Sequence, residues 1–305
     1  MSADHVVRFG MLEGEGVVDA EWAVYDPQNM GVATPFAQNG SSAKNLALVL
    51  NAYEARAMSG GSNQTLEACA AIIATQQNAK VVVVKMGAAG ALVWTAGKVE
   101  TVPAYRTSNV WKIGSGDCFV AYFAHAWMQE RRSPREAAEF ASRATAFYCE
   151  TTQLPTAADL AAFNPPEVQV SAAFSAGTKR QVYLAGPFFD LAQLWMVEEA
   201  RRNLRETGLK VFSPYHDIGL GRAADVVEQD LEGIENSDLV FAIADGLDAG
   251  TIYEIGYARA KGKPVVVYSE RESEEALKMA EGSGCVICRN YTTALYSALW
   301  EAAKL

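Results

Sequence analysis

Short apolar runs alternate with longer amphipathic segments through the second half of the chain. The runs have the length of strands and cover 182–185, 209–213, 239–244, 264–268 and 285–288. The segments between them have helical spacing and cover about 190–206, 224–236, 251–261, 273–281 and 292–303. This alternation predicts a parallel sheet with helices on both faces, which binds ligands at the carboxyl ends of its strands. We therefore predict a flavodoxin-like parallel-sheet domain over 179–305.

The first half of the chain also alternates, with less regular spacing. Strands are predicted at 21–25, 80–85 and 91–95, and helices at 66–75, 117–129 and 135–150. Residues 43–58 predict a further helix, because apolar side chains follow helical spacing at Leu46, Val49, Leu50 and Tyr53. Residues 165–178 combine prolines and small residues with weak periodicity, which predicts a linker. The chain is thus expected to hold two α/β domains, over 1–164 and 179–305.

Length and charge limit the classes of partner. The 305 residues match about two domains of ordinary size. The 36 acidic and 26 basic residues give a formal charge of −10, which disfavours nucleic acid or an anionic membrane as the main partner. The apolar runs are too short to cross a bilayer, and no signal peptide opens the sequence. We expect a cytoplasmic protein that acts on small molecules.

The five cysteines predict buried thiols rather than a metal site. Cys285 and Cys288 form a single Cys-x-x-Cys motif, whereas zinc sites normally need a second pair or histidines. The three histidines do not cluster with this motif. We therefore expect no metal ligands.

Aromatic residues follow the first strand predicted in the second half. Gly186-Pro187 breaks this strand and lets the backbone approach a ligand. Phe188 and Phe189 come next and are candidates to stack on a planar ring, although core packing explains them equally well.

Carboxylates follow the third strand of this half, at Asp245, Asp248 and Glu254. Gly250-Thr251 predicts a helix start, so we expect Glu254 in the first turn, where the helix dipole favours its ionised form. An ionised carboxylate in a pocket can act as a nucleophile. The alternative is an acid that only complements the dipole, and Asp230 can equally be a solvated helix acid.

Five motifs in this half together resemble the nucleoside 2-deoxyribosyltransferases, over about 179–290. In order, they are Tyr183-Leu-Ala-Gly-Pro-Phe-Phe, Val211-Phe-Ser-Pro, Asp230-(x)7-Asp238, Asp245-Gly-x-Asp248-x-Gly-Thr-x-x-Glu254-Ile-Gly-Tyr-Ala and Gly262-Lys-Pro. The resemblance implies that Glu254 attacks the anomeric carbon, displaces the nucleobase and forms a covalent ester. A second base or water then resolves this ester, so transferase and hydrolase both stay open.

The same resemblance implies further roles. Tyr183 orients Glu254, Asp230 helps to protonate the leaving base, and Asp248 binds the sugar hydroxyls. Because an aspartate repels a phosphate at close range, a free nucleoside is favoured over a nucleotide. Gly186, Phe188, Phe189 and Asp245 are the remaining predicted substrate-binding residues. The resemblance also implies a homo-oligomer and no cofactor for the glycosyl chemistry.

Three motifs in the first half resemble the ribokinase-like (PfkB) carbohydrate kinases. They are Asn51-Ala-Tyr-Glu54, expected at a helix end, Val82-Val-Val-Lys85-Met-Gly-Ala-Ala-Gly, and Gly114-Ser-Gly116-Asp117-Cys-Phe. The resemblance implies that Asn51 and Glu54 organise Mg²⁺ and phosphates. Lys85 lies on the nucleotide side, Gly114 and Gly116 open an anion hole, and Asp117 is the general base.

The first half also departs from this family. Only about 160 residues precede the second domain, whereas the family usually needs ~300, and the part expected to be missing carries most of the sugar pocket. The Asp-Thr-Thr that usually precedes the Gly-rich motif is Trp111-Lys112-Ile113 here. Binding of ATP and Mg²⁺ is therefore one possibility for this domain, and a scaffold is another. The alternatives for the whole protein are a sugar or nucleoside kinase and a non-catalytic nucleotide or nucleoside sensor.

Overall fold

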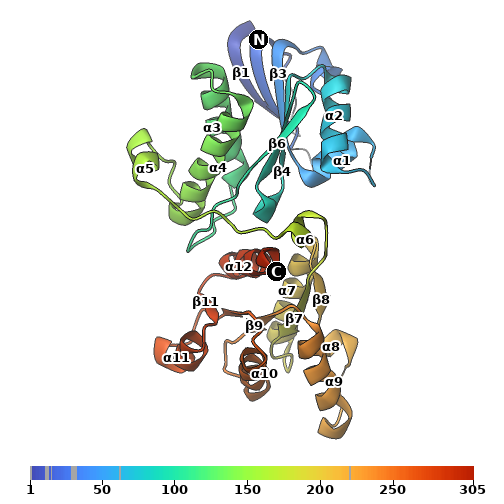
Figure 1. Cartoon of the computed structure of the whole chain (residues 1–305), viewed down its shortest axis with the longest axis vertical. Helices are drawn as coiled ribbons and strands as arrows, with labels where there is room; N and C mark the ends of the chain where they lie inside the picture. Colours follow the sequence, from blue (N-terminus) through green and yellow to red (C-terminus); the bar gives the residue numbers. More distant parts are fainter. Residues whose placement is uncertain (1, 11–13, 15, 29–32, 62, 220) are drawn as a thin grey trace. The chain divides into compact units, whose positions relative to one another are not determined.

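The computed structural model describes residues 2–10, 14, 16–28, 33–61, 63–219 and 221–305 (Figure 1). The chain divides into two compact units. The N-terminal unit contains Met1–Thr107 and Trp111–Val168, and the C-terminal unit contains Ser108–Val110 and Gln169–Leu305. Each unit has its own sheet, which confirms the predicted α/β fold class.

The N-terminal unit is built on a mixed six-stranded sheet. Its strands lie in sequence order and are β1 (Ser2–Phe9), β2 (Asp19–Asp26), β3 (Ser42–Asn51), β4 (Val81–Lys85), β5 (Ala91–Thr95) and β6 (Lys98–Val102). The first four strands are parallel, and the last two continue the sheet as an antiparallel hairpin. The carboxyl ends of β2, β3 and β4 therefore meet at one edge of the sheet.

Helices cover both faces of this sheet (Figure 1). One face packs against α1 (Ala52–Ser59) and α2 (Leu66–Gln77). The other packs against α3 (Ser115–Ala124), its π-helical continuation over His125–Gln129, and α4 (Pro134–Thr151). The short helix α5 (Ala157–Ala162) follows and contacts α4.

The helix predicted over 43–58 is wrong for most of its length. Residues 42–51 form the central strand β3, and a helix begins only at Ala52. The five residues from Leu46 to Leu50 are all buried, since helices cover both faces of the strand. A strand buried on both faces has a continuous apolar run, which does not show the alternation that separates a strand from a helix.

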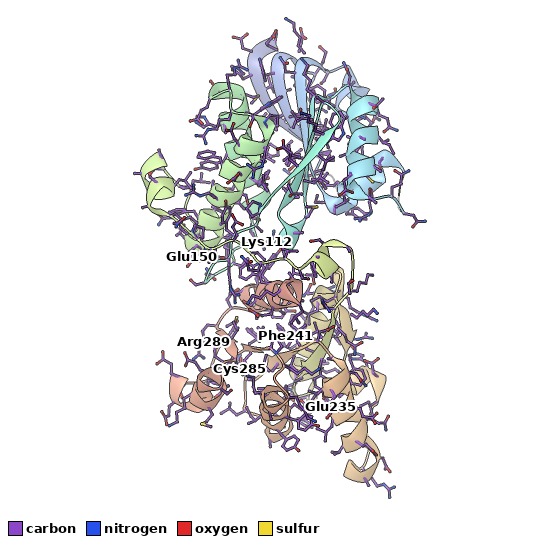
Figure 2. The ribbon with its side chains drawn as sticks, in the orientation of Figure 1. Lys112, Glu150, Glu235, Phe241, Cys285 and Arg289 are labelled. Atoms are coloured by element: carbon purple, nitrogen blue, oxygen red, sulfur yellow. The ribbon has the colours of Figure 1, made fainter. Side chains whose placement is uncertain are left out.

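The C-terminal unit has an all-parallel sheet in the order β11-β10-β9-β7-β8. The strands are β7 (Gln181–Ala185), β8 (Lys210–Phe212), β9 (Leu239–Ile243), β10 (Val265–Tyr268) and β11 (Val286–Cys288). This order is doubly wound and flavodoxin-like, which confirms the flavodoxin-like parallel sheet predicted from the sequence. Phe241 is fully buried at the centre of the sheet, on β9 (Figure 2).

Helices also cover both faces of the second sheet. One face packs against α9 (Ala223–Asn236), α10 (Ala249–Ala260) and α11 (Glu274–Gly282). The helices α7 (Leu191–Glu206) and α12 (Tyr291–Lys304) contact each other and the strands β8, β9, β10 and β11. Two short helices complete the unit, α6 (Ala172–Ser175) and α8 (Pro214–Asp217).

Residues 165–178, predicted as a linker, contain some local structure. Glu167 forms an isolated antiparallel bridge with Tyr105, and α6 lies at 172–175. The boundaries of this linker stay a prediction.

Two further predictions can be compared with the structure. All five cysteines are buried thiols outside any disulfide, as predicted, and Cys285 is among the residues labelled in Figure 2. Among the described residues, no helix has the length and apolar character that a membrane span requires.

Candidate active site

The carboxyl ends of β7 and β9 meet where the strand order of the C-terminal unit reverses. β7 pairs with β8 on one side and with β9 on the other, so the connections that leave β7 and β9 run in opposite directions. Open parallel sheets bind ligands in the crevice at such a point. Tyr183 lies on β7 and Glu254 on α10, the helix that follows β9.

Tyr183 and Glu254 form the centre of the candidate site. The Tyr183 hydroxyl donates a hydrogen bond to Oε1 of Glu254 over 2.5 Å. The Tyr183 ring is fully buried and stacks on Phe212, with ring centroids 5.7 Å apart. Burial, reinforced by the Glu254 carboxylate, raises the pKa of Tyr183, so the hydroxyl keeps its proton and remains a donor.

Glu254 lies further along its helix than predicted. α10 begins at Ala249 with Asp248 as its N-cap, and no acidic residue occupies the first turn. The prediction that the helix dipole favours an ionised Glu254 is therefore wrong. Burial is the dominant effect and raises the pKa of Glu254 to about 7. The hydrogen bond from Tyr183 opposes this rise, while the charges of Asp230 and Asp248 add to it.

Asp230, on α9, is the second acid of the site. Its Oδ1 atom is buried, and no hydrogen-bond partner for it exists among the described residues. Burial raises the pKa of this carboxyl group, which favours its protonated form. Its charge also raises the pKa of Glu254, so the two groups lie within electrostatic range of each other. This arrangement can supply one carboxylate nucleophile and one proton donor.

Asp248 and Asp245 follow β9 and make different contacts. Asp248 uses Oδ2 to accept hydrogen bonds from the amide and the hydroxyl of Thr251, at 2.8 and 3.1 Å. Asp245 accepts from the Ser269 hydroxyl at 2.8 Å and from the Arg271 amide at 3.0 Å, both through Oδ1. Asp245 thus stabilises the loop after β10, and its predicted contact with substrate stays a prediction.

Aromatic rings gather after β7 and β8. Phe188 packs on Phe189 and on Tyr215, with ring centroids 5.4 and 5.3 Å apart. Phe189 is 73% exposed, so it is available to a ligand rather than to the core. A Cβ atom at Gly186 would lie 3.2 Å from the Ile243 side chain. This close contact favours glycine at position 186.

Gly233 is a site residue that the sequence predictions missed. A Cβ atom at Gly233 would lie 2.4 Å from Cε1 of Phe212, the ring that stacks on Tyr183. Only glycine therefore lets α9 approach Phe212 this closely. Since α9 also carries Asp230, this contact sets how near Asp230 lies to Tyr183 and Glu254.

In the N-terminal unit, Asn51 and Glu54 form the first turn of a helix rather than a helix end. Asn51 is the N-cap of α1, and its Oδ1 accepts a hydrogen bond from the Glu54 amide over 2.8 Å. Glu54 accepts in return from the Asn51 amide over 2.7 Å. The spacing of these two residues is therefore also that of a capping box, which stabilises a helix start without any ligand.

The other kinase-like residues gather at the carboxyl ends of the same parallel strands. Gly114 has a φ of 79° and is the N-cap of α3, and its left-handed conformation favours glycine. A Cβ atom at Gly116 would lie 3.6 Å from the Lys85 ammonium group. Asp117, in the first turn of α3, accepts a hydrogen bond from the Gln28 amide group over 3.2 Å. The structure thus brings Lys85, at the end of β4, to the start of α3.

Lys85 and the residues at the start of α3 form a second cluster. Asp26 also belongs to this cluster, although the sequence predictions did not include it. It lies at the end of β2, is buried, and pairs with Lys85 over 3.1 Å through Oδ2. Its Oδ1 is buried and has no partner among the described residues. Burial raises the pKa of Asp26, and the charges of Glu54 and Asp117 add to the rise. A strand that ends in Asp-Pro was the available signal.

No group of three or more histidine, cysteine or acidic side chains forms a ready metal site in the part of the chain that the structure describes. In the second cluster, Lys85 is instead the cation that pairs with Asp26.

Each half of the chain matches a known protein family. Residues 182–287 match the family model of nucleoside 2-deoxyribosyltransferase, and residues 37–159 match that of the pfkB family carbohydrate kinase. A comparison with curated protein sequences gives no match.

Solved structures similar to this chain include members of both families. A 2-deoxyribosyltransferase from Bacillus psychrosaccharolyticus is 30% identical, with a TM-score of 0.33, and the match covers 39% of this chain and 90% of that one. A ribokinase from Thermotoga maritima is 24% identical, with a TM-score of 0.40, over 46% of this chain and 48% of that one. A ribokinase from Arabidopsis thaliana is 20% identical, with a TM-score of 0.38, over 48% and 55%.

This chain thus spans about half the length of the ribokinases that it matches, and nearly the whole length of the deoxyribosyltransferase. The C-terminal unit therefore belongs to the nucleoside 2-deoxyribosyltransferase family, and residues 37–159 of the N-terminal unit resemble the pfkB family carbohydrate kinases.

Proposed function

We propose that the C-terminal unit cleaves the N-glycosidic bond of a nucleoside through a covalent ester on Glu254. The deoxyribosyl group then passes to another nucleobase or to water. The single observation that carries this proposal is the Tyr183–Glu254 pair, in which the hydroxyl of the buried Tyr183 donates to one carboxylate oxygen of the half-buried Glu254 over 2.5 Å. The other oxygen, Oε2, is the atom proposed to attack the anomeric carbon.

The environment of Glu254 suits a nucleophile at neutral pH. With a pKa of about 7, the group is roughly half ionised there, and its burial leaves the carboxylate poorly solvated. Carboxylates act as nucleophiles in glycoside chemistry, where the transition state has oxocarbenium-ion character and is stabilised by negative charge. Tyr183 keeps Oε1 in a hydrogen bond and thereby restrains the direction of attack.

Asp230 acts as an acid in the first step of the proposed reaction and as a base in the second. In the first step, protonated Asp230 gives its proton to the leaving nitrogen of the base while Glu254 forms the bond to the anomeric carbon. In the second step, the incoming base nitrogen or water oxygen bonds to the anomeric carbon while the bond from that carbon to Glu254 breaks, and ionised Asp230 takes the proton of the attacking group, which restores both carboxyl groups. The raised pKa of Asp230 supports the acid role in the first step.

The acidic character of the site supports a nucleoside as substrate rather than a nucleotide. Asp248 binds Thr251 through Oδ2, and Oδ1 is proposed to accept from a sugar hydroxyl. Asp230 and Asp248 both act on Glu254 by charge, so a phosphate bound there would meet three acids.

Product analysis tests this function. The protein is incubated with purine and pyrimidine deoxynucleosides, each with and without a second base, and free and newly formed nucleosides are separated by chromatography. We expect release of free base, or formation of a new nucleoside when an acceptor base is present. Absence of both products from every substrate would contradict the proposal.

We propose a second function for the N-terminal unit, namely binding of ATP with Mg²⁺ near Asn51, Glu54, Lys85 and Gly114–Asp117. The support is the convergence of Lys85 on the start of α3, together with the buried Oδ1 of Asp26, which has no hydrogen-bond partner among the described residues. Amide groups at a helix start and a lysine suit phosphates, while carboxylate oxygens suit Mg²⁺. Asp26 and Glu54 are the residues that would hold the ion, which would neutralise phosphate charge.

Thermal denaturation with ATP and Mg²⁺ tests this second site. We expect a rise in melting temperature that Lys85→Ala abolishes, because ligand binding stabilises the folded state. An unchanged melting temperature, and no ATP consumption with ribose or nucleosides, would make this unit a scaffold. The homo-oligomer expected from the family is a separate proposal, which light scattering of the whole protein tests.

A further inference from the structure

Three side chains beside the candidate active site form a continuous hydrogen-bonded chain that the proposed reaction does not use. Nδ1 of His216 lies 2.9 Å from the Ser213 hydroxyl, and Nε2 lies 2.8 Å from Oε1 of Glu198. Ser213 directly follows β8, His216 lies on α8, and Glu198 lies on α7. We call these three residues the histidine clamp.

The histidine clamp has the residue types of a nucleophilic triad but not the exposure of one. Ser213 is only 1% exposed, so its hydroxyl has no open path to a substrate atom. A nucleophile needs to reach the reacting centre. The clamp therefore has another task, which its position in the fold indicates.

The clamp connects the turn after β8 to the helix after β7. The turn is closed locally, because the Ser213 amide donates to Oδ2 of Asp217 over 2.7 Å. Glu198 adds a link from α7, across 18 residues of sequence. Both ring nitrogens of His216 are thus occupied, which holds the imidazole, and the turn that carries it, in one orientation.

Tyr215 is the residue that this turn presents to the site. Its ring lies edge-on to the His216 ring, with centroids 5.0 Å apart and an interplanar angle of 87°. On its other side it packs on Phe188, with centroids 5.3 Å apart. Phe188 in turn contacts Phe189, which is exposed. His216 therefore supports one end of a row of three aromatic rings.

We propose that His216 is a positioning residue for the nucleobase. Through Ser213 and Glu198 it holds Tyr215 against Phe188, so that these rings form one wall of the subsite for a planar heterocyclic base. This inference rests on the proposed function and adds to it the residues that set base affinity. Its consequence is that loss of the clamp weakens binding of the base and leaves the chemistry at Glu254 intact.

The test uses Glu198→Ala as the main variant, because the Glu198 side chain is half exposed and its removal leaves no core cavity. Glu199→Ala is the matched control, since the neighbouring Glu199 pairs instead with Arg202 on the same helix. His216→Ala and the double variant complete the set. Steady-state kinetics with a deoxynucleoside, and calorimetric binding of adenine, cytosine and 2-deoxyribose, are measured for each protein.

We expect KM to rise about fivefold in Glu198→Ala and about tenfold in His216→Ala, with kcat changed less than about threefold. The double variant should match His216→Ala, because both residues act through one contact. Affinity for adenine or cytosine should fall by the same factors, while affinity for 2-deoxyribose stays constant. Glu199→Ala should behave as the wild type.

Two results would overturn the inference in distinguishable ways. If the wild type releases base but KM and base affinity are unchanged in Glu198→Ala and His216→Ala, or kcat alone falls, the histidine clamp does not position the base and the proposed function stands. If the wild type neither releases nor binds any base, the proposed function fails and the inference fails with it.

Discussion

Replacing Tyr183 with phenylalanine should move the pH dependence of base release. The substitution keeps the buried ring and its stacking on Phe212 but removes the hydroxyl that donates to Glu254. This hydrogen bond lowers the pKa of Glu254 against the larger effect of burial. Without it, the pKa of Glu254 rises above its present value of about 7, and the nucleophile is less ionised at neutral pH.

The size of the shift follows from the strength of such a bond. A hydrogen bond to a charged group contributes about 1.5–3 kcal/mol, and one pKa unit corresponds to about 1.4 kcal/mol. The pKa of Glu254 should therefore rise by about one to two units. At pH 7 the ionised fraction falls from about one half to about 1–9%, so kcat/KM should fall about 5- to 50-fold.

The assay measures kcat/KM for base release between pH 5 and 10. The low-pH limb of this profile reports the ionisation of Glu254 in the free enzyme. We expect the limb of Tyr183→Phe to lie at higher pH, with activity recovering towards the wild-type value in alkaline buffer. Tyr257→Phe is the control, because Tyr257 lies on the same helix but donates to Glu235. A pH-independent loss in Tyr183→Phe would refute the reasoning, since it would mean that the hydroxyl does not tune Glu254.

Three further predictions concern stability and catalysis. Glu254→Gln should stabilise the folded protein above pH 7. The free energy of unfolding should rise by up to about 3 kcal/mol there, with a higher melting temperature, and by much less below pH 4.5. The sign follows because burial penalises the ionised form in the folded state only, and calorimetry at pH 4.5 and 8 measures the difference. Gly233→Ala should destabilise the protein by about 1–3 kcal/mol and slow base release, because its Cβ would overlap Phe212. Denaturant unfolding measures the loss of stability, and Gly256→Ala is the control, because the space around Gly256 is open. Asp230→Asn should slow base release by about 10²–10⁴-fold, and a substrate with an activated leaving group should restore much of the rate; equal losses with both substrates would contradict the acid role.

The architecture of the C-terminal unit could be predicted because each of its segments has an unambiguous pattern. Strand-sized apolar runs such as 239–243 alternate with helices that have one apolar face, and the predicted parallel sheet is observed. The central strand β3 could not be predicted in the same way. Like β9 it is buried on both faces and shows no alternation of apolar and polar residues, but it leads directly into a helix, so its length does not mark it as a strand.

The identity of the candidate site residues could be predicted, but their environment could not. Tyr183 and Glu254 are 71 positions apart, and only the folded sheet brings the hydroxyl to the carboxylate. The ionisation of Glu254 was predicted with the wrong sign, because the helix begins one to two residues earlier than predicted, which leaves Glu254 beyond the first turn, and because burial dominates. Burial depends on packing partners that are distant in sequence.

Asp26 and Gly233 show a second limit of sequence reasoning. Asp26 is one of many acids in the chain, and its distinction is a buried oxygen that finds no partner in the described part of the chain. Gly233 is one of 24 glycines, and its distinction is the approach of a single aromatic ring. The Asp-Pro at the end of a strand points to Asp26, but the burial of its oxygen and the approach of the ring to Gly233 depend on residues distant in sequence.

Direct detection of the ester on Glu254 tests the central mechanism most closely. The protein is incubated with a 2′-fluorinated arabinosyl nucleoside, whose electron-withdrawing fluorine slows breakdown of the ester, and a proteolytic digest is analysed by mass spectrometry. We predict a fluorinated sugar adduct on the peptide that contains Glu254, and neither adduct nor base release in Glu254→Ala. Base release by the wild type without any adduct, or unchanged turnover in Glu254→Ala, would contradict a covalent mechanism at this residue.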